Sequence, residues 1–138
     1  MHYADFFCGC GGLSIGLAQC GWKCELAVDI DEHSLKLYSK NLKHHPVLKH
    51  DLRLPLPNTN YLREALKTGA LVGGPSCQDF STACPVGKRH LGTRAALTLA
   101  FADHVAALQP KWVVFENVRT SANSTEFRKF VERLQKLD

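Results

Sequence analysis

Short apolar runs alternate with longer segments of helical periodicity along this chain of 138 residues. The apolar runs, which predict β-strands, occupy residues 4–7, 23–29, 47–48, 70–72 and 111–115. Apolar residues recur at helical spacing in residues 13–20, 32–42, 61–68 and 94–108, and a last helix is expected from Ser124 or Thr125. This alternation predicts an α/β fold with a mostly parallel, doubly wound sheet.

Two of these elements carry further expectations. Asp31 precedes the helix at residues 32–42 and is expected to cap its N-terminus. The strand at residues 111–115 is continuously apolar, which is typical of a parallel strand buried on both faces. We therefore expect this strand to be buried.

Polar and glycine-rich segments follow four of the predicted strands. They are the loops at residues 7–12, 73–81 and 116–118, together with Asp29 at the end of the second strand. The carboxyl ends of parallel strands meet at one edge of the sheet, and ligands bind there in doubly wound folds. The sequence thus predicts one site that gathers a glycine loop, two acids and a thiol.

Composition narrows the class of protein. Hydrophobic residues make up 45% of the chain and charged residues 22%, as in ordinary globular domains. No apolar run is long enough to span a membrane, and no secretory signal is visible, so we expect a cytoplasmic protein without membrane association. The net charge of +4 is compatible with a polyanionic partner but does not identify one.

The cysteines are expected to be free thiols, because disulfides are rare in the cytoplasm. They are Cys8, Cys10, Cys20, Cys24, Cys77 and Cys84. A zinc site from the first four is an alternative, but their Cys-x-Cys and Cys-x-x-x-Cys pairs fit zinc knuckles poorly. No metal is therefore predicted.

Cys77 stands in a loop that opens from a predicted strand. Leu71 and Val72 are followed by Gly73-Gly74-Pro75-Ser76-Cys77, which ends the strand with residues that favour turns and close backbone approach. A thiol on such a loop is a candidate nucleophile. The alternative is a small buried thiol at the end of a strand.

The first glycine loop and Asp29 indicate a nucleoside-containing cofactor. The loop lacks the Gly-Lys-Ser/Thr of a phosphate-binding loop and the strict spacing of a dinucleotide fingerprint. Asp29, about twenty residues further on, ends a strand where an acid can bind both hydroxyls of a ribose. S-adenosylmethionine fits these features, whereas a tight turn and a helix-capping acid are the structural alternatives.

Glu116 follows the apolar strand at residues 111–115. Desolvation at such a strand end favours the protonated carboxyl, which can then donate a proton. Asn117 is expected to orient Glu116 by a hydrogen bond. The alternative is a solvated strand end without a catalytic role.

Three segments together resemble the cytosine-C5 DNA methyltransferase family. Asp5-Phe6-Phe7-Cys8-Gly9-Cys10-Gly11-Gly12-Leu13-Ser14 is similar to its cofactor motif, Gly73-Gly74-Pro75-Ser76-Cys77-Gln78-Asp79-Phe80-Ser81 to its nucleophile motif, and Glu116-Asn117-Val118 to its glutamate motif. Their order and spacing agree over nearly the whole chain. The resemblance implies a Rossmann-like fold and methyl transfer from S-adenosylmethionine to C5 of cytosine in DNA, as in restriction–modification systems.

The resemblance also assigns roles to residues. Cys77 would attack C6 of a flipped-out cytosine, Glu116 would support the ring at N3, and Asn117 would complete the catalytic set. Asp29 would hold the ribose and Asp51-Leu52 would flank the adenine. The full cofactor set would be Asp5, Phe6, Phe7, Cys8, Gly9, Gly11, Gly12, Asp29, Ile30, Asp51, Leu52, Gly74 and Pro75. The residues that contact substrate would be Ser81, Lys88, Arg89 and Arg94, on or next to a closing loop.

The sequence departs from the family pattern in two ways. Ser76 stands where the family usually has proline, which frees the backbone before Cys77 and is expected to loosen its placement. The family's later arginine motif, target-recognition region and final helix have no counterpart in residues 1–138. We therefore expect a partial catalytic domain, truncated at its C-terminus or completed by a second chain, with little activity alone. A tRNA cytosine-C5 methyltransferase and a binding-only remnant of the fold are the alternatives.

Overall fold

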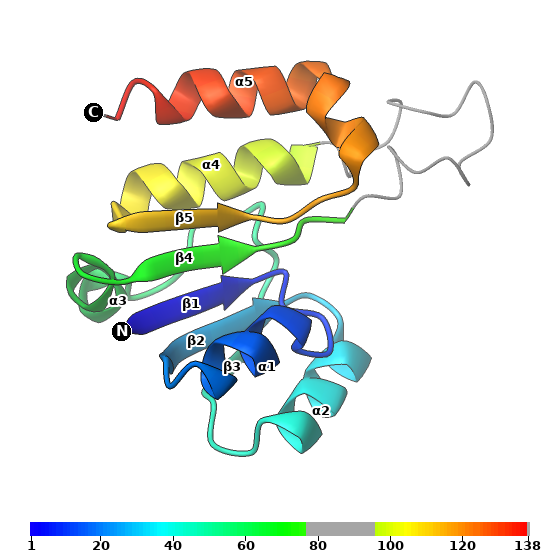
Figure 1. The fold of residues 1–138 in the computed structure, drawn as a ribbon, viewed down its shortest axis with the longest axis vertical. Coiled ribbons are helices and arrows are strands. Elements are labelled where there is room, and N and C mark those ends of the chain that lie inside the picture. Colours follow the sequence, from blue (N-terminus) through cyan, green and yellow to red (C-terminus); the bar gives the residue numbers. More distant parts are fainter. Residues whose placement is uncertain (77–95, 138) are drawn as a thin grey trace.

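Five parallel strands form one sheet in the order β3-β2-β1-β4-β5 (Figure 1). The computed structural model describes residues 1–76 and 96–137. The strands are β1 (His2–Phe6), β2 (Lys23–Asp29), β3 (Val47–Lys49), β4 (Ala70–Gly73) and β5 (Trp112–Phe115). The order reverses direction at β1 and β4, so the carboxyl ends of these two strands flank the crevice in which doubly wound folds bind ligands. The predicted α/β fold class is confirmed.

Helices cover both faces of this sheet. They are α1 (Gly12–Gln19), α2 (Glu32–Asn41), α3 (Asn60–Leu66), α4 (Ala96–Leu108) and α5 (Thr125–Leu134), with a 3-10 turn η1 (Arg119–Asn123) before α5. The alternation of side chains along β1 divides the core, because successive residues point to opposite faces. Tyr3 packs with α1 and α2, whereas Ala4 and Phe6 pack with α3, α4 and α5. None of the helices in the described part of the chain is long and apolar enough to cross a membrane.

Side chains cap two of the helices. The carboxylate of Asp31 accepts hydrogen bonds from the backbone N–H groups of His33 and Ser34, at 3.3 and 3.0 Å, at the start of α2. This confirms the predicted cap. Ser124 accepts from the N–H of Phe127 at 3.1 Å and caps α5 in the same way. The helix α1 differs, because Gly11 precedes it and no side chain caps it.

The prediction for the fifth strand is wrong. β5 lies at the edge of the sheet, and Trp112 and Val114 are 54% and 44% exposed. Their neighbours Val113 and Phe115 turn toward the helices and pack against the core of α4 and α5. A continuous apolar run is compatible with an interior strand and with an edge strand whose outer face is apolar, so the sequence pattern did not separate the two.

The first strand also ends earlier than predicted. It stops at Phe6, because Phe7 adopts a left-handed conformation with φ of 58°. Such a conformation is uncommon for a residue with a side chain and does not continue a strand. The turn therefore begins at Phe7, inside the apolar run.

Candidate cofactor and active site

The glycine loop between β1 and α1 contains three left-handed residues. Phe7, Gly9 and Gly11 have φ values of 58°, 53° and 97°. A Cβ atom built on Gly11 would lie 3.0 Å from the ring of Tyr38, a tight contact, and a φ of 97° is strained for any residue with a side chain. The N–H of Cys8 still donates to the carbonyl of Val28 at 3.1 Å, which holds the start of the loop against β2.

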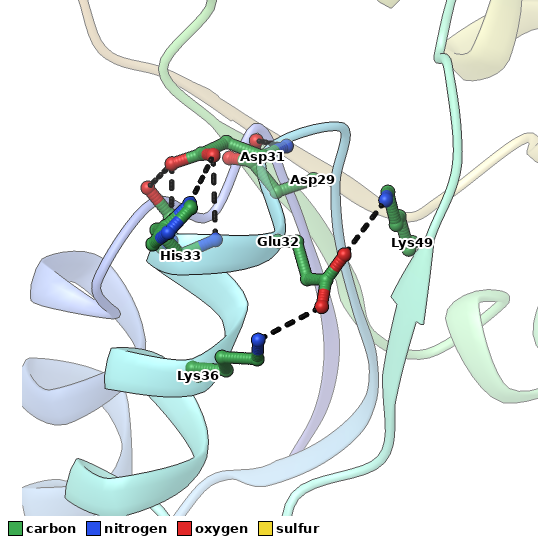
Figure 2. Close-up of polar contacts among 7 residues, drawn as sticks. Asp29, Asp31, Glu32, His33, Lys36 and Lys49 are labelled. Atoms are coloured by element: carbon green, nitrogen blue, oxygen red, sulfur yellow. Dashed lines mark hydrogen bonds and ion pairs between the residues drawn. The ribbon is translucent and has the colours of Figure 1, made fainter.

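Asp29 joins this loop to the next one. Its carboxylate accepts from the N–H of Gly9 at 2.9 Å and from the N–H of Asp31 at 2.9 Å. Figure 2 shows Asp29 beside the cap of α2, where Asp31 binds the first turn of the helix. The helix-capping alternative for Asp29 is thus excluded, because Asp31 is the cap. The carboxylate instead braces the glycine loop at the carboxyl edge of the sheet.

Asp5 is a buried acid with one unpartnered oxygen. The side chain is 1% exposed, Ser14 Oγ donates to its Oδ2 at 2.6 Å, and Tyr38 Oη donates to Ser14 Oγ at 2.7 Å. Its Oδ1 is buried without a hydrogen-bond partner among the described residues. Burial raises the pKa of Asp5 to about 6, and the negative charge of Asp29 adds to this, against the hydrogen bond from Ser14. A buried carboxylate oxygen without a partner calls for an explanation, and a bound cation would supply one.

A cavity of about 210 Å³ opens beside the glycine loop. Phe7, Ile30, Asp51 and Leu52, all predicted to contact the cofactor, line it together. The cavity is completed by three residues that the sequence analysis did not select: His50, Arg53 and Leu97. Its walls are mostly apolar and Asp51 adds one carboxylate, a combination that suits a nucleobase with an amino group.

A larger cavity of about 480 Å³ lies elsewhere. It is formed by α4, α5 and the start of β5, with Val105, Val113 and Leu134 among its lining residues. No residue of the predicted site lines it. Size alone would favour this cavity, but Asp51 and Phe7 of the glycine loop line the smaller one.

The loops after β4 and β5 are tied together. Glu116 donates its backbone N–H to the carbonyl of Gly73 at 2.9 Å, and Asn117 Nδ2 donates to the carbonyl of Pro75 at 2.9 Å. A Cβ atom on Gly74 would lie 2.8 Å from Glu116 Oε2, so the carboxylate rests against this glycine. The backbone that leads into Cys77 is therefore fixed next to Glu116.

Two expectations for this pair are wrong. Glu116 is exposed, so the described residues do not desolvate its carboxylate. The amide of Asn117 binds the carbonyl of Pro75 and the N–H of Val118, and no hydrogen bond joins it to the side chain of Glu116 in the described part of the chain. Asn117 orients the loop that precedes Cys77 instead of orienting Glu116.

The family of the chain follows from comparison with known proteins. The family described as C-5 cytosine-specific DNA methylase matches residues 1–138. The chain belongs to this family. It is 43% identical over 122 residues to the type II methyltransferase M.HgiDI of Herpetosiphon aurantiacus and 40% identical over 122 residues to M.HindV of Haemophilus influenzae. These matches cover 86% of this chain but 37% and 38% of those proteins, so the chain spans well under half of their length.

A shorter relative and the solved structures complete the comparison. The type II methyltransferase M.HgiGI of Herpetosiphon aurantiacus is 41% identical over 119 residues, and the match covers 90% of it. A prophage-encoded DNA modification methyltransferase from E. coli superposes with a TM-score of 0.76 at 26% identity, over 99% of this chain and 37% of that one. Spodoptera frugiperda DNMT2 gives a TM-score of 0.75 at 20% identity over 99% of this chain and 41% of that one, a likeness of fold.

The remaining predicted residues of this methylase chain fall into two groups. Phe6 lies away from the cavity, fully buried and edge-on to His104, so its side chain belongs to the core. Cys8 is also buried, and burial raises the pKa of its thiol. Gly12 is the first residue of α1, at its uncapped end. The predicted residues outside the described part of the chain are Cys77, Ser81, Lys88, Arg89 and Arg94.

The described cysteines do not form a metal site. Cys8 and Cys24 are buried and Cys10 and Cys20 are exposed, and residues 1–76 and 96–137 contain no cluster of three or more potential metal ligands. Burial raises the pKa of the Cys24 thiol as it does that of Cys8. Because the thiolate is the nucleophile, these two buried thiols are unsuited to covalent catalysis.

Proposed function

We propose that this chain is the cofactor-binding and nucleophile part of a DNA (cytosine-5-)-methyltransferase. The proposal is that it transfers a methyl group from S-adenosylmethionine to C5 of cytosine through a covalent bond to Cys77. The observation that carries it is the convergence, at one edge of the sheet, of the braced glycine loop, the buried acid Asp5 and the loops of Gly73 and Glu116. Membership of the methylase family supports the same assignment.

The residues at this edge fit S-adenosylmethionine. The methionine part of this cofactor carries an ammonium and a sulfonium, and Oδ1 of Asp5 is a buried acceptor to which no described residue donates a hydrogen bond. The uncapped N-terminus of α1 can donate to a carboxylate. Asp29 would hold the ribose hydroxyls, while Phe7 and Ile30 would enclose the adenine near Asp51. The bound cofactor would supply an electrophilic methyl group.

The chain's own residues would perform the remaining chemistry. Cys77, as a thiolate, would add to C6 of cytosine and make C5 electron-rich, which splits one difficult substitution into easier steps. Glu116, once the bound base excludes water from its carboxylate, would hold a proton at N3 of the cytosine and stabilise the developing charge. Asn117 would hold the backbone that leads to Cys77 through its bond to Pro75. Once C5 carries the methyl group, loss of the C5 proton to water would restore the C5–C6 double bond, break the bond from C6 to sulfur and release Cys77 as a thiolate.

Cytosine must leave the duplex to expose C6 to a thiolate, so the base would be flipped out. Lys88, Arg89 and Arg94 would contact phosphates, and Ser81 would line the site of the flipped nucleotide. Contacts of this kind position the protein without reading sequence. The net charge of +4 would favour association with the negatively charged backbone of DNA. A cytoplasmic location in a bacterium would place the chain in the same compartment as its DNA.

A second chain would supply the part of the domain that this chain does not span. The open edge of β5 supports this, because it presents unpaired strand backbone beside the exposed side chains of Trp112 and Val114. An added strand would cover this apolar edge. We propose that the chain alone transfers methyl groups poorly, since one wall of the cofactor site and the target-recognition region would come from the partner.

Transfer of labelled methyl groups tests this function. We expect the purified chain to label duplex DNA weakly, and the C-terminal portion of M.HgiDI, added as a second chain, to raise the labelling at least tenfold. A Cys77→Ser chain is the matched control and is expected to leave the DNA unlabelled. Labelling of tRNA but not of DNA would replace this proposal by the tRNA alternative. Strong labelling of DNA by the chain alone would contradict the need for a second chain.

A further inference from the structure

Asp51, the acid proposed to bind the adenine, already pairs with Arg53. Arg53 Nε lies 2.9 and 3.0 Å from the two carboxylate oxygens of Asp51, and its Nη2 lies 2.5 Å from Oδ2. The backbone N–H of Arg53 donates to Oδ1 at 3.0 Å. A planar guanidinium that grips both oxygens fixes the orientation of a carboxylate as well as its charge. The hydrogen bonds to Arg53 hold the pKa of Asp51 at about 2.

The same turn is held from the opposite side. His104, a buried residue of α4, has its Nε2 2.8 Å from the carbonyl oxygen of Leu52. Its ring stands edge-on to Phe6, with centroids 5.2 Å apart. The turn from Asp51 to Arg53 is thus anchored to the core through Leu52, and Arg53 itself lines the 210 Å³ cavity. The backbone of this wall is tied to α4, and Arg53 orients the carboxylate of Asp51.

This arrangement has a consequence for the choice of ligand. A fixed, ionised carboxylate only accepts hydrogen bonds, so it favours a purine with a 6-amino group and repels a 6-oxo group. Without Arg53 the carboxylate would lose the bonds that fix its orientation and could rotate away from the cavity, so that it would no longer distinguish a 6-amino from a 6-oxo group. We propose that Arg53 is a positioning residue that makes the cavity selective for 6-aminopurine over 6-oxopurine cofactors. This inference rests on the proposed S-adenosylmethionine site.

The test compares two ligands that differ only at the 6-substituent and in the proton that N1 carries in the 6-oxo form. S-adenosylhomocysteine carries the 6-amino group and S-inosylhomocysteine the 6-oxo group. For the wild-type chain we expect the dissociation constant of the inosine compound to be about 10- to 100-fold higher, as for one unsatisfied buried polar contact. In Arg53→Met, which keeps an unbranched apolar side chain without the guanidinium, we expect this ratio to fall below about threefold.

The ratio of the two dissociation constants distinguishes a role in positioning Asp51 from a general loss of structure in the cavity. A merely structural loss would weaken both ligands together and leave the ratio unchanged, and that result would overturn the inference. Lys49→Met is the matched control, because Lys49 is a nearby cation that pairs with Glu32 at 3.0 Å and does not line the cavity (Figure 2). Its ratio should equal that of the wild type. If the wild-type chain bound both ligands equally, Arg53 would have no such role, whereas binding of neither at millimolar concentration would overturn the proposed function as well.

Discussion

Cys77→Ser is expected to abolish methyl transfer, with a loss of roughly 10⁴-fold or more, the scale seen when a covalent nucleophile is removed. A serine hydroxyl is almost wholly protonated near neutral pH and is a far weaker nucleophile than a thiolate. The measurement is transfer of labelled methyl groups to duplex DNA by the chain together with its complementing C-terminal portion. A residual rate near that of the wild type would remove Cys77 from the mechanism.

A duplex that contains 5-fluorocytosine isolates the covalent step. Fluorine at C5 cannot leave as a proton does, so an adduct between Cys77 and C6 would stay trapped and would migrate as a protein–DNA species on a denaturing gel. With S-adenosylmethionine and the complementing C-terminal portion present, we expect the wild-type chain to form this species and Cys77→Ser to form none. Cys20→Ser, which alters an exposed thiol at the end of α1, should behave as the wild type. An adduct that persists in Cys77→Ser would show that another residue is the nucleophile.

Asp5→Asn is expected to stabilise the fold near pH 7.5 and to weaken the binding of S-adenosylhomocysteine. Burial, with the charge of Asp29, raises the pKa of Asp5 to about 6, so the ionised carboxylate destabilises the native state above this pH. Asparagine keeps an acceptor for the Ser14 hydroxyl without the buried charge. The gain in free energy of unfolding is at most about 3 kcal/mol. Loss of the carboxylate would cost about 10-fold or more in affinity for the ammonium of the ligand.

The direction of the stability difference between Asp5→Asn and the wild type depends on pH. The pKa of Asp5 in the native state lies above its ordinary value of about 3.9. The native state therefore takes up a proton as the pH falls through about 6, and the cost of the charged form disappears. Asp5→Asn should exceed the wild type in stability at pH 7.5 and lose this advantage near pH 4. Urea unfolding at both values measures it, with the exposed Glu132→Gln as control. Lower stability of Asp5→Asn at pH 7.5 would contradict the account.

Periodicity was enough to predict the order of the elements. The strand at Lys23–Asp29 and the helix that follows Asp31 have the predicted starts, because alternating and helical spacings reflect which face of an element is buried. The position of β5 at the sheet edge was not predictable in this way. An edge strand pairs with only one neighbour, and which strands are neighbours depends on contacts distant in sequence.

The same distinction between local patterns and long-range contacts applies to the site. Motif spacing directed attention to the carboxyl edge, but it did not reveal the bond from Gly9 to Asp29 or the bond from Asn117 to Pro75, which joins residues 42 positions apart. Side-chain partners at such distances depend on strand register. The pairing of Arg53 with Asp51 is different, since the two residues are two positions apart and opposite in charge. That local signal was present in the sequence and could have been used.

Binding of S-adenosylhomocysteine to the ¹⁵N-labelled chain, followed by amide chemical shifts, tests the central claim most directly because it detects weak binding and locates it. We predict shift changes that centre on Phe7, Ile30 and Asp51, which line the 210 Å³ cavity, and on the bonded pair Gly9 and Asp29, and that saturate with one ligand per chain. Residues of the larger cavity, such as Val113 and Leu134, should stay unchanged. Changes centred on that larger cavity, or none at millimolar ligand, would contradict a cofactor site at the carboxyl edge of the sheet.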